Sequence, residues 1–336
     1  MSSLSLISLF EQANKYKRLC VAKRHTFSVI NHYAQSEHEK YQKYAEKILN
    51  CSNEIKIRLS TDFTTEGIIT QSSIENARWC RCRQCPMCQF ARASKHRAKF
   101  FKAFAGVDLS KRDYAFLTLT HRNRPLNELR DSLKEMTEGW HRFSRRRTFP
   151  VTGWLRSMEV TMQRQRLPGD KKKNTGPPVR SPEGQLMSHP HFHILLEMEP
   201  GYFENNLKKT EWWSSEWQSA VRCDYGPTVF IRKIRAGNDG DFSKALLETA
   251  KYCTKPEDFG EHRDAAEWLY GITEQLHGLR SIRVGASFSK LLSQKELDKI
   301  DIDCSDYEEH SQSGKLLTLT WNDIADRWDI FTDDEG

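Results

Sequence analysis

Residues 189–196 read His189-Pro-His-Phe-His-Ile-Leu-Leu196, with histidines at positions 189, 191 and 193. Side chains alternate between the two faces of a β-strand, so all three imidazoles are expected on one face of a single strand. Neutral imidazole is a common ligand of divalent metals. A lone histidine here would be read as a polar core residue. Three histidines in five residues, running into an apolar segment, favour a metal-binding strand.

The strand expected before this one supplies a carboxylate. In residues 153–161, GWLRSMEVT, Glu159 falls in the middle of a segment that otherwise looks buried. A buried carboxylate is costly unless it has a partner, and a metal ion is one such partner. Consecutive strands are usually antiparallel neighbours, which places Glu159 beside His191 and His193. His189 remains a rival for the third ligand position.

Composition limits the class of protein. The chain has 336 residues and a net charge of +7, with a mean hydropathy of −0.72. It has no run of about 18 apolar residues, so no membrane segment is expected. Its first residues lack the features of a signal peptide, and a cytoplasmic location is therefore expected. Between Arg78 and Arg112 ten Lys or Arg face one acid, Asp108. Such a cluster favours nucleic acid as partner over a plain solvated surface.

The cysteines indicate a second metal site. There are nine, and four lie between residues 80 and 88. Disulfides between such near neighbours are strained, so clustering favours metal binding in a reducing compartment. Cys85-Pro-Met-Cys88 has the spacing of a zinc knuckle, and four thiolates would make the zinc structural. The candidates for the two remaining ligands are Cys51, Cys80, Cys82 and His96.

Two basic segments are predicted to contact DNA. Residues 89–105 are expected to form an amphipathic helix in which Phe90, Phe101 and Phe104 pack while the cations face outward. A second basic cluster ends the helix expected over 126–147. Beside a zinc knuckle, contact with DNA phosphates is favoured over a plain surface helix. The predicted DNA-contacting residues are Arg92, Lys95, Arg97, Lys99, Arg145, Arg146 and Arg147.

A third group of polar residues lies near position 250. Residues 242–254, FSKALLETAKYCT, are expected to be helical. Glu248, Tyr252 and Lys255 then fall at i, i+4 and i+7, on one face. A carboxylate, a phenol and an ammonium on one stripe form a usable catalytic set. Taken alone, however, the spacing fits a surface ion pair beside a half-buried tyrosine better.

The arrangement of segments predicts an α+β fold, with a central antiparallel sheet and helices packed against one or both faces. We expect three regions. Residues 1–110 form a helical, Cys-rich module that binds zinc and contacts DNA. Residues 111–292 form the catalytic domain, and residues 293–336 an acidic C-terminal extension.

Together, these motifs resemble those of the plasmid rolling-circle replication initiators, a family of the HUH endonuclease superfamily. Residues 116–120, FLTLT, are similar to the family's first motif. Residues 189–196 are similar to its second, with His191 and His193 as the pair. Residues 248–255, EXXXYXXK, are similar to its third. Cys51, Cys80 and Cys85-Pro-Met-Cys88 resemble its N-terminal cysteine pattern. The likeness covers roughly residues 40–290 and departs from the pattern at Cys82 and in the long basic loop 163–184.

The resemblance implies a fold like the RNA-recognition-motif (RRM) domain and a nicking mechanism. Tyr252 would attack a DNA phosphodiester, forming a 5′-phosphotyrosine link and freeing a 3′-OH that primes replication. Mg²⁺ or Mn²⁺ on His191, His193 and Glu159 would activate the phosphate. The metal or Lys255 would offset the high pKa of a phenol. Glu248 would activate water when replication ends.

The same resemblance implies partners. Plasmid origin DNA, both duplex and exposed single strand, would be the substrate, and a host replication helicase and polymerase would be partners. The oligomeric state does not follow from the sequence. The alternative functions are an HUH transposase or relaxase, and a non-enzymatic zinc regulator that only binds DNA.

Overall fold

The computed structural model describes residues 14–64, 67–169, 175–205, 210–235, 239–251, 253–260, 262–303 and 314–332. The chain divides into two compact units. The first contains residues 1–92, 259–261 and 302–336, and the second contains residues 93–258 and 262–301. The sequence suggested breaks after residues 110 and 292. The contacts instead assign the C-terminal residues to the N-terminal unit.

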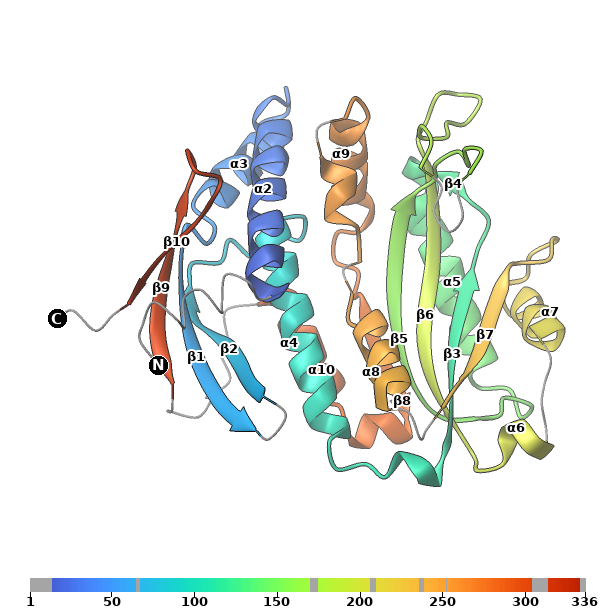
Figure 1. Ribbon diagram of the computed structural model, residues 1–336. Coiled ribbons are helices and arrows are strands. Elements are labelled where there is room, and N and C mark those ends of the chain that lie inside the picture. Colours follow the sequence, from blue (N-terminus) through green and yellow to red (C-terminus); the bar gives the residue numbers. More distant parts are fainter. Residues whose placement is uncertain are drawn as a thin grey trace. The chain divides into compact units, whose positions relative to one another are not determined.

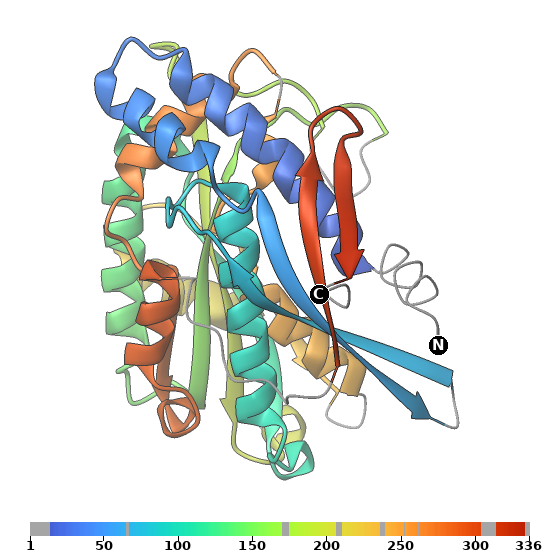
Figure 2. The same ribbon diagram turned by 90° about the vertical axis from the view of Figure 1, so that its left-hand side faces the viewer.

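The first unit is a four-stranded antiparallel sheet with helices. The sheet has the strand order β10-β9-β1-β2, so strands from the two ends of the chain lie side by side (Figure 2). Its elements are α2 (Asn14–Ala34), α3 (Glu39–Leu49), β1 (Glu54–Thr64), β2 (Gly67–Ala77), β9 (Lys315–Asn322) and β10 (Arg327–Thr332).

Apolar side chains at every second position hold this sheet to its helices. Ile55, Ile57 and Leu59 of β1 are all buried, as expected for the inner face of a half-buried strand. The Trp321 and Trp328 rings of β9 and β10 lie edge to face with centroids 5.2 Å apart. Tyr16 of α2 donates to the Trp328 carbonyl at 3.0 Å.

Helix α4 (Pro86–Phe104) begins in the first unit and ends in the second. Phe90 and Phe104 are buried as predicted, but Phe101 is 39% exposed and Phe100 packs in its place. Phe100 and Phe104 belong to the core cluster of the second unit. The neighbouring phenylalanines point in directions about 100° apart, so only one of them can face this core.

The second unit is built on an antiparallel sheet with the strand order β7-β3-β6-β5-β8, and β4 pairs with β6 (Figure 1). The predicted α+β fold with an antiparallel sheet is confirmed. The strands are β3 (Asp113–Thr120), β4 (Arg124–Pro125), β5 (Val151–Met162), β6 (Met187–Met198), β7 (Val229–Ile234) and β8 (Ile282–Ala286).

Helices cover both faces of this sheet. On one face, Trp140 of α5 packs edge to face on Trp154 of β5, with centroids 5.3 Å apart. On the other, Phe242 of α8 packs on Tyr114 of β3, with centroids 4.9 Å apart. The helices are α5 (Leu129–Phe143), α6 (Tyr202–Asn205), α7 (Thr210–Val221), α8 (Asp239–Thr249), α9 (Ala265–Gln275) and α10 (Gln294–Ile302). Short 3₁₀ turns are η1 (Leu109–Lys111), η2 (Leu126–Glu128), η3 (Pro256–Phe259) and η4 (Ser287–Lys290).

Helix α8 is shorter than predicted. It ends at Thr249, and the chain then joins the edge of β5, where the Val160 amide donates to the Cys253 carbonyl at 2.8 Å. Pro256 disfavours a helical conformation only at Lys255, the residue before it. The prediction that one helix face carries positions 248, 252 and 255 is therefore wrong. None of the helices in the described ranges is long and apolar enough to cross a membrane.

Candidate metal centres and catalytic site

The histidine strand β6 lies between β3 and β5, which fixes the neighbours of each imidazole. Glu159 pairs with His191 across β5 and β6, and Ser157 pairs with His193. Thr118 pairs with His193 from the other side. Directly paired residues present their side chains on the same face. The predicted juxtaposition of Glu159 with His191 and His193 is confirmed.

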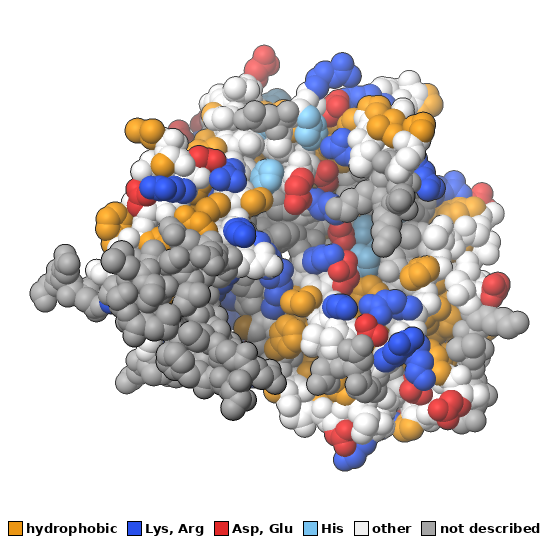
Figure 3. Space-filling model, in the orientation of Figure 1, with side chains coloured by type: hydrophobic (Ala, Val, Ile, Leu, Met, Phe, Trp, Pro, Cys, Tyr) orange, Lys and Arg blue, Asp and Glu red, His pale blue; other side chains and the backbone are white. Residues whose placement is uncertain are grey.

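The ligand atoms converge on one point. The Nε2 atoms of His193 and His191 lie 3.0 Å and 3.3 Å from Glu159 Oε2. The ligand atoms of Glu159, His191 and His193 all lie within 4.8 Å of one another, so the group could hold a metal ion. In Figure 3 histidine side chains reach the surface beside acidic and basic ones.

The contacts of the Nδ1 atoms of His191 and His193 explain why a cation fits between the Nε2 atoms and Glu159. His191 Nδ1 faces the His189 carbonyl at 3.3 Å, and a carbonyl can only accept, so Nδ1 carries a proton. A neutral imidazole then directs the Nε2 lone pair at the Glu159 carboxylate, which is repulsive unless a proton or metal ion lies between them. His193 Nδ1 is 3.2 Å from Thr118 Oγ1, and this contact orients the second ring.

His189, the rival third ligand, is directed elsewhere. Its Nδ1 lies 2.6 Å from Asn123 Oδ1, and it is not part of the converging group. Burial, together with the neighbouring His191, lowers the pKa of His189 to about 4. The ring is therefore neutral at physiological pH and acts as a hydrogen-bonding partner of Asn123.

The electrostatics of the site favour an ionised carboxylate. Burial raises the pKa of Glu159, but the contacts with His191 and His193, each with a proton between the ring nitrogen and the carboxylate, outweigh it and hold that pKa well below its usual range. Lys255 Nζ lies 3.8 Å from Glu159 Oε1. This exposed ammonium adds positive charge beside the carboxylate.

The structure brings together only part of the predicted catalytic set. Lys255 lies beside the Glu159 carboxylate. Glu248 instead pairs with Lys251 at 2.5 Å. Tyr252 lies outside the described residues, although Lys251 and Cys253 on either side of it are described. The bridge between Val160 and Thr254 places Thr254 against β5, beside the residue that follows Glu159.

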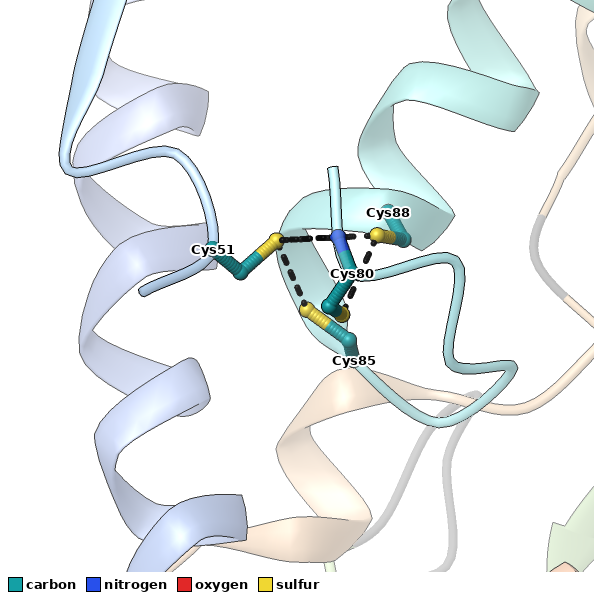
Figure 4. A group of neighbouring side chains, drawn as sticks. All are labelled: Cys51, Cys80, Cys85 and Cys88. Atoms are coloured by element: carbon teal, nitrogen blue, oxygen red, sulfur yellow. Dashed lines mark hydrogen bonds between the residues drawn. The ribbon is translucent and has the colours of Figure 1, made fainter. Parts of the chain in front are cut away.

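The first unit holds a second group of ligands, four cysteines whose sulfurs face one another (Figure 4). Cys51 precedes β1, Cys80 follows β2, and Cys85 and Cys88 flank the start of α4. The Sγ atoms of Cys51 and Cys88 are 3.6 Å apart, and those of Cys80 and Cys88 are 3.5 Å apart. A tetrahedral zinc with ~2.3 Å bonds to sulfur requires S···S distances of roughly 3.8 Å, close to those found.

The thiols of this group influence one another. Hydrogen bonds from the neighbouring thiols, that of Cys80 above all, lower the pKa of Cys51, while the same contact raises the pKa of Cys80. Cys85 and Cys88 sit at the N-terminus of α4, where the helix dipole stabilises negative charge. The two rival ligands lie outside the group. Cys82 Sγ faces the Cys80 carbonyl at 3.8 Å, and His96 Nε2 faces Asp301 at 3.1 Å.

Lys23 lies beside the cysteine group, a position that the sequence does not indicate. It lies on α2, is 1% exposed, and donates to the Cys51 carbonyl at 2.8 Å and to Asn53 Oδ1 at 2.6 Å. A zinc ion held by four thiolates would leave two negative charges in excess, and this buried ammonium would offset one of them. In the sequence Lys23 is one of several lysines on a basic helix, and nothing marks it out.

Comparison with known proteins gives the family. The sequence profile of the Replication protein family, Rep_1, matches residues 71–329. The chain belongs to this family. The match includes both the Glu159–His191–His193 group and three of the four clustered cysteines, and it confirms the resemblance to plasmid replication initiators.

Curated relatives of this replication protein are described as "Protein rep" or "Replication protein". It is 27% identical over 272 residues to "Protein rep" of Streptococcus pneumoniae serotype 2, a match that covers 77% of each chain. It is 28% identical to "Protein rep" of a Bacillus species, covering 65% of this chain and 68% of the relative. It is 29% identical to "Replication protein" of Staphylococcus aureus, covering 62% and 86%. No solved structure matches the chain significantly.

The basic residues predicted to contact DNA differ in their surroundings. Arg145 and Arg147 of the replication protein are exposed. Lys95, Arg97 and Lys99 are half-buried, and Lys99 pairs with Glu296 at 3.0 Å. Arg146 pairs with Glu216 at 2.5 Å.

Arg92 is the exception to the prediction that the cations of α4 face outward. It is 9% exposed and donates to the carbonyls of Arg81 and Cys82, at 2.7 Å and 3.3 Å. The outward-facing prediction is wrong for this residue, because the cysteine loop needs donors for its buried carbonyls.

Proposed function

We propose that this replication protein is a metal-dependent nickase of the HUH type that starts rolling-circle replication at a plasmid origin. Tyr252 is the nucleophile, and Glu159, His191 and His193 hold Mg²⁺ or Mn²⁺. The observation that carries the proposal is the convergence of two imidazole Nε2 atoms and one carboxylate oxygen within 4.8 Å. The set suits a divalent ion with open positions for phosphate oxygens.

In the nicking step the Tyr252 oxygen attacks the scissile phosphorus. A tyrosine–phosphorus bond forms, the bond to the 3′-oxygen breaks, and the phenolic proton is lost while the departing oxygen gains a proton to become a 3′-OH. A divalent ion bound at the three ligands would polarise the phosphate and balance the charge of the transition state. Lys255, 3.8 Å from Glu159, supplies further positive charge and favours the ionised phenol.

Joining reverses these bonds. A 3′-OH attacks the phosphotyrosine, the phosphodiester forms and Tyr252 is released. At termination water takes the place of the 3′-OH, and Glu248 accepts its proton as a general base. The Glu248 carboxylate is one-third exposed and pairs with Lys251, so it is open to solvent.

The first unit has a separate role in this proposal. Zn²⁺ on Cys51, Cys80, Cys85 and Cys88 is structural, since four thiolates leave no open coordination position. In the second unit, exposed Arg145 and Arg147, with the half-buried Lys95, Arg97 and Lys99 of α4, contact the phosphates of origin DNA. A host helicase and polymerase then extend the freed 3′-OH.

A nicking assay tests the proposal. Supercoiled plasmid carrying the DNA that flanks this gene is incubated with the purified protein and Mn²⁺. Wild type is expected to produce open circles and Tyr252→Phe none, with equal DNA binding. If both proteins bind DNA and neither nicks, a non-enzymatic zinc regulator is the better reading. Transfer of the cut strand to an unrelated target without replication would favour a transposase or relaxase.

The role of Glu248 has its own test. Glu248→Ala is expected to nick at the wild-type rate and to accumulate covalent complex, because release by water is lost. Glu257→Ala, an exposed carboxylate a few residues beyond Lys255, is the matched control and should behave as wild type. Equal loss of nicking and of release in Glu248→Ala would contradict the assignment.

A further inference from the structure

The second unit exposes an aromatic ring on the same face as the metal ligands. Phe230 of β7 is 63% exposed, more than any other phenylalanine among the described residues. Strand β7 is the edge of its sheet and pairs only with β3 in the described part of the chain. Leaving a phenyl ring in water forgoes the stabilisation that burial would give, so the exposed ring points to a ligand.

The register relates this ring to the metal ligands. Phe230 pairs with Thr118, and Thr118 pairs with His193. The three side chains therefore form one row across β7, β3 and β6, on one face. Neighbouring strands are about 4.8 Å apart, which puts the Phe230 backbone roughly 10 Å from that of His193.

A cation stands next to the ring on the same face. Arg232 pairs with Phe116, and its guanidinium carbon lies 5.5 Å from the centre of that ring. Phe116 in turn stacks on His193, with centroids 5.6 Å apart and planes inclined by 24°. No carboxylate pairs with Arg232 among the residues that the structure describes. Its charge is thus available to a phosphate at the edge of the metal group.

We propose that Phe230 and Arg232 form a subsite for single-stranded DNA, in which Phe230 stacks on an unpaired base and Arg232 contacts a phosphate. The inference deepens the proposed function and rests on it for the presence of DNA at this face. An aromatic ring beside a cation is the combination that binds single strands without reading sequence. One ring with charged neighbours is too small an apolar patch for a protein partner. A paired base is not free to stack, so the subsite holds single-stranded DNA.

Binding of fluorescein-labelled (dT)20 to the full-length protein, measured by anisotropy without added divalent ions, tests the subsite. Phe230→Ala is expected to bind roughly 5- to 100-fold more weakly, the loss that one stacked base represents. Phe230→Trp should bind as tightly as wild type. Phe230→Leu, which keeps an apolar side chain without a ring, should bind as weakly as Phe230→Ala. Binding by Phe230→Leu equal to that of Phe230→Trp would overturn base stacking.

Two controls sharpen the result. Phe331→Ala removes a ring that is 53% exposed on β10 of the first unit, and should leave binding unchanged. An abasic oligonucleotide of the same length should bind wild type and Phe230→Ala equally, since it offers no base. Arg232→Gln should reduce the salt dependence of binding by about one phosphate contact. Equal weakening of (dT)20 and the abasic strand by Phe230→Ala would contradict the subsite.

The same variants separate this inference from the proposed function. If wild type does not nick DNA but binding depends on the Phe230 ring, the nickase is wrong and the subsite stands. If wild type nicks and binding is independent of the ring, the subsite alone is wrong.

Discussion

His193 Nε2 lies 3.0 Å from Glu159 Oε2, although the two residues are 34 positions apart in the chain. Antiparallel pairing of β5 with β6 creates this contact, and the same register puts His191 directly opposite Glu159. Strand pairing therefore positions the three candidate metal ligands. The loop between the strands can vary in length without disturbing it.

Removing the charge of the Glu159 carboxylate should weaken metal binding. Glu159→Gln is expected to bind Mn²⁺ at least tenfold more weakly, because the amide keeps the shape but loses the charge that balances the cation. Titration followed by electron paramagnetic resonance of free Mn²⁺ measures the loss.

Glu197→Gln is the matched control for this prediction. Glu197 lies buried on the same face of the sheet, where it accepts from Thr152 Oγ1 at 2.9 Å and from Ser287 Oγ at 2.5 Å. This variant should lose stability and keep its metal affinity. Unchanged Mn²⁺ affinity in Glu159→Gln would show that the group is not a metal site.

Cys88 and Cys82 are expected to respond differently to substitution, because only Cys88 belongs to the group of four facing sulfurs. Cys88→Ser should lose its zinc and melt at a markedly lower temperature, because structural zinc contributes folding free energy directly. Cys82→Ser should keep one zinc per chain, since its sulfur lies outside the group. Zinc content by plasma mass spectrometry, together with thermal denaturation, distinguishes the two. The reverse outcome would assign the fourth ligand to Cys82.

Lys23 should govern how firmly zinc is held. Lys23→Met keeps much of the side-chain volume but removes the ammonium beside the Cys51 carbonyl. Zinc release to a coloured chelator is then expected to accelerate on the order of tenfold, as when a group supporting a metal ligand is lost. Lys17→Met, on the exposed side of the same helix, should release zinc at the wild-type rate. Identical rates for all three proteins would remove Lys23 from the site.

Asp258 should make stability depend on pH. It is buried in η3, and burial raises its pKa from 3.8 to about 6. Between pH ~4 and ~6 the folded state therefore holds a proton that the unfolded state has released. Stability falls as pH rises through this window, by on the order of 2–3 kcal/mol. Asp258→Asn removes the effect.

Thermal denaturation at pH 4 and pH 7 measures this dependence. The variant should gain stability relative to wild type at pH 7 and show little difference at pH 4. A constant difference between the two proteins across this range would show that Asp258 is charged in the folded state throughout.

Much of the metal site could be predicted from the sequence because strand periodicity is local. The alternation of side chains along a strand predicted that His191 and His193 share one face. The order of the strands in the chain predicted that the strand of Glu159 lies beside theirs. Pairing of chain ends is not local, and no pattern in residues 54–59 indicates that they pair with residues 315–320. The end of α8 at Thr249 depends on the hydrogen bond between Val160 and Cys253, which a helix-forming sequence does not reveal.

Which side chains are buried and which are exposed could not be predicted from the sequence at several positions. Arg92 and Lys23 look like surface residues in the sequence, yet each is buried because backbone carbonyls near the cysteines need donors. Phe230 looks like a core residue of its strand and is exposed, because β7 is at the edge of the sheet. Whether such a residue is buried or exposed depends on neighbours that are distant in the sequence.

The central claim is that Tyr252 becomes covalently joined to DNA beside the Glu159–His191–His193 group. Wild-type protein is incubated with Mn²⁺ and single-stranded DNA that spans the origin, digested with protease and nuclease, and analysed by tandem mass spectrometry. The account predicts one modified peptide, residues 252–255 with their flanks, bearing a 5′-nucleotide on the Tyr252 oxygen. Tyr252→Phe and Glu159→Gln should yield none. An adduct on another residue, or cleaved DNA without any adduct, would contradict it.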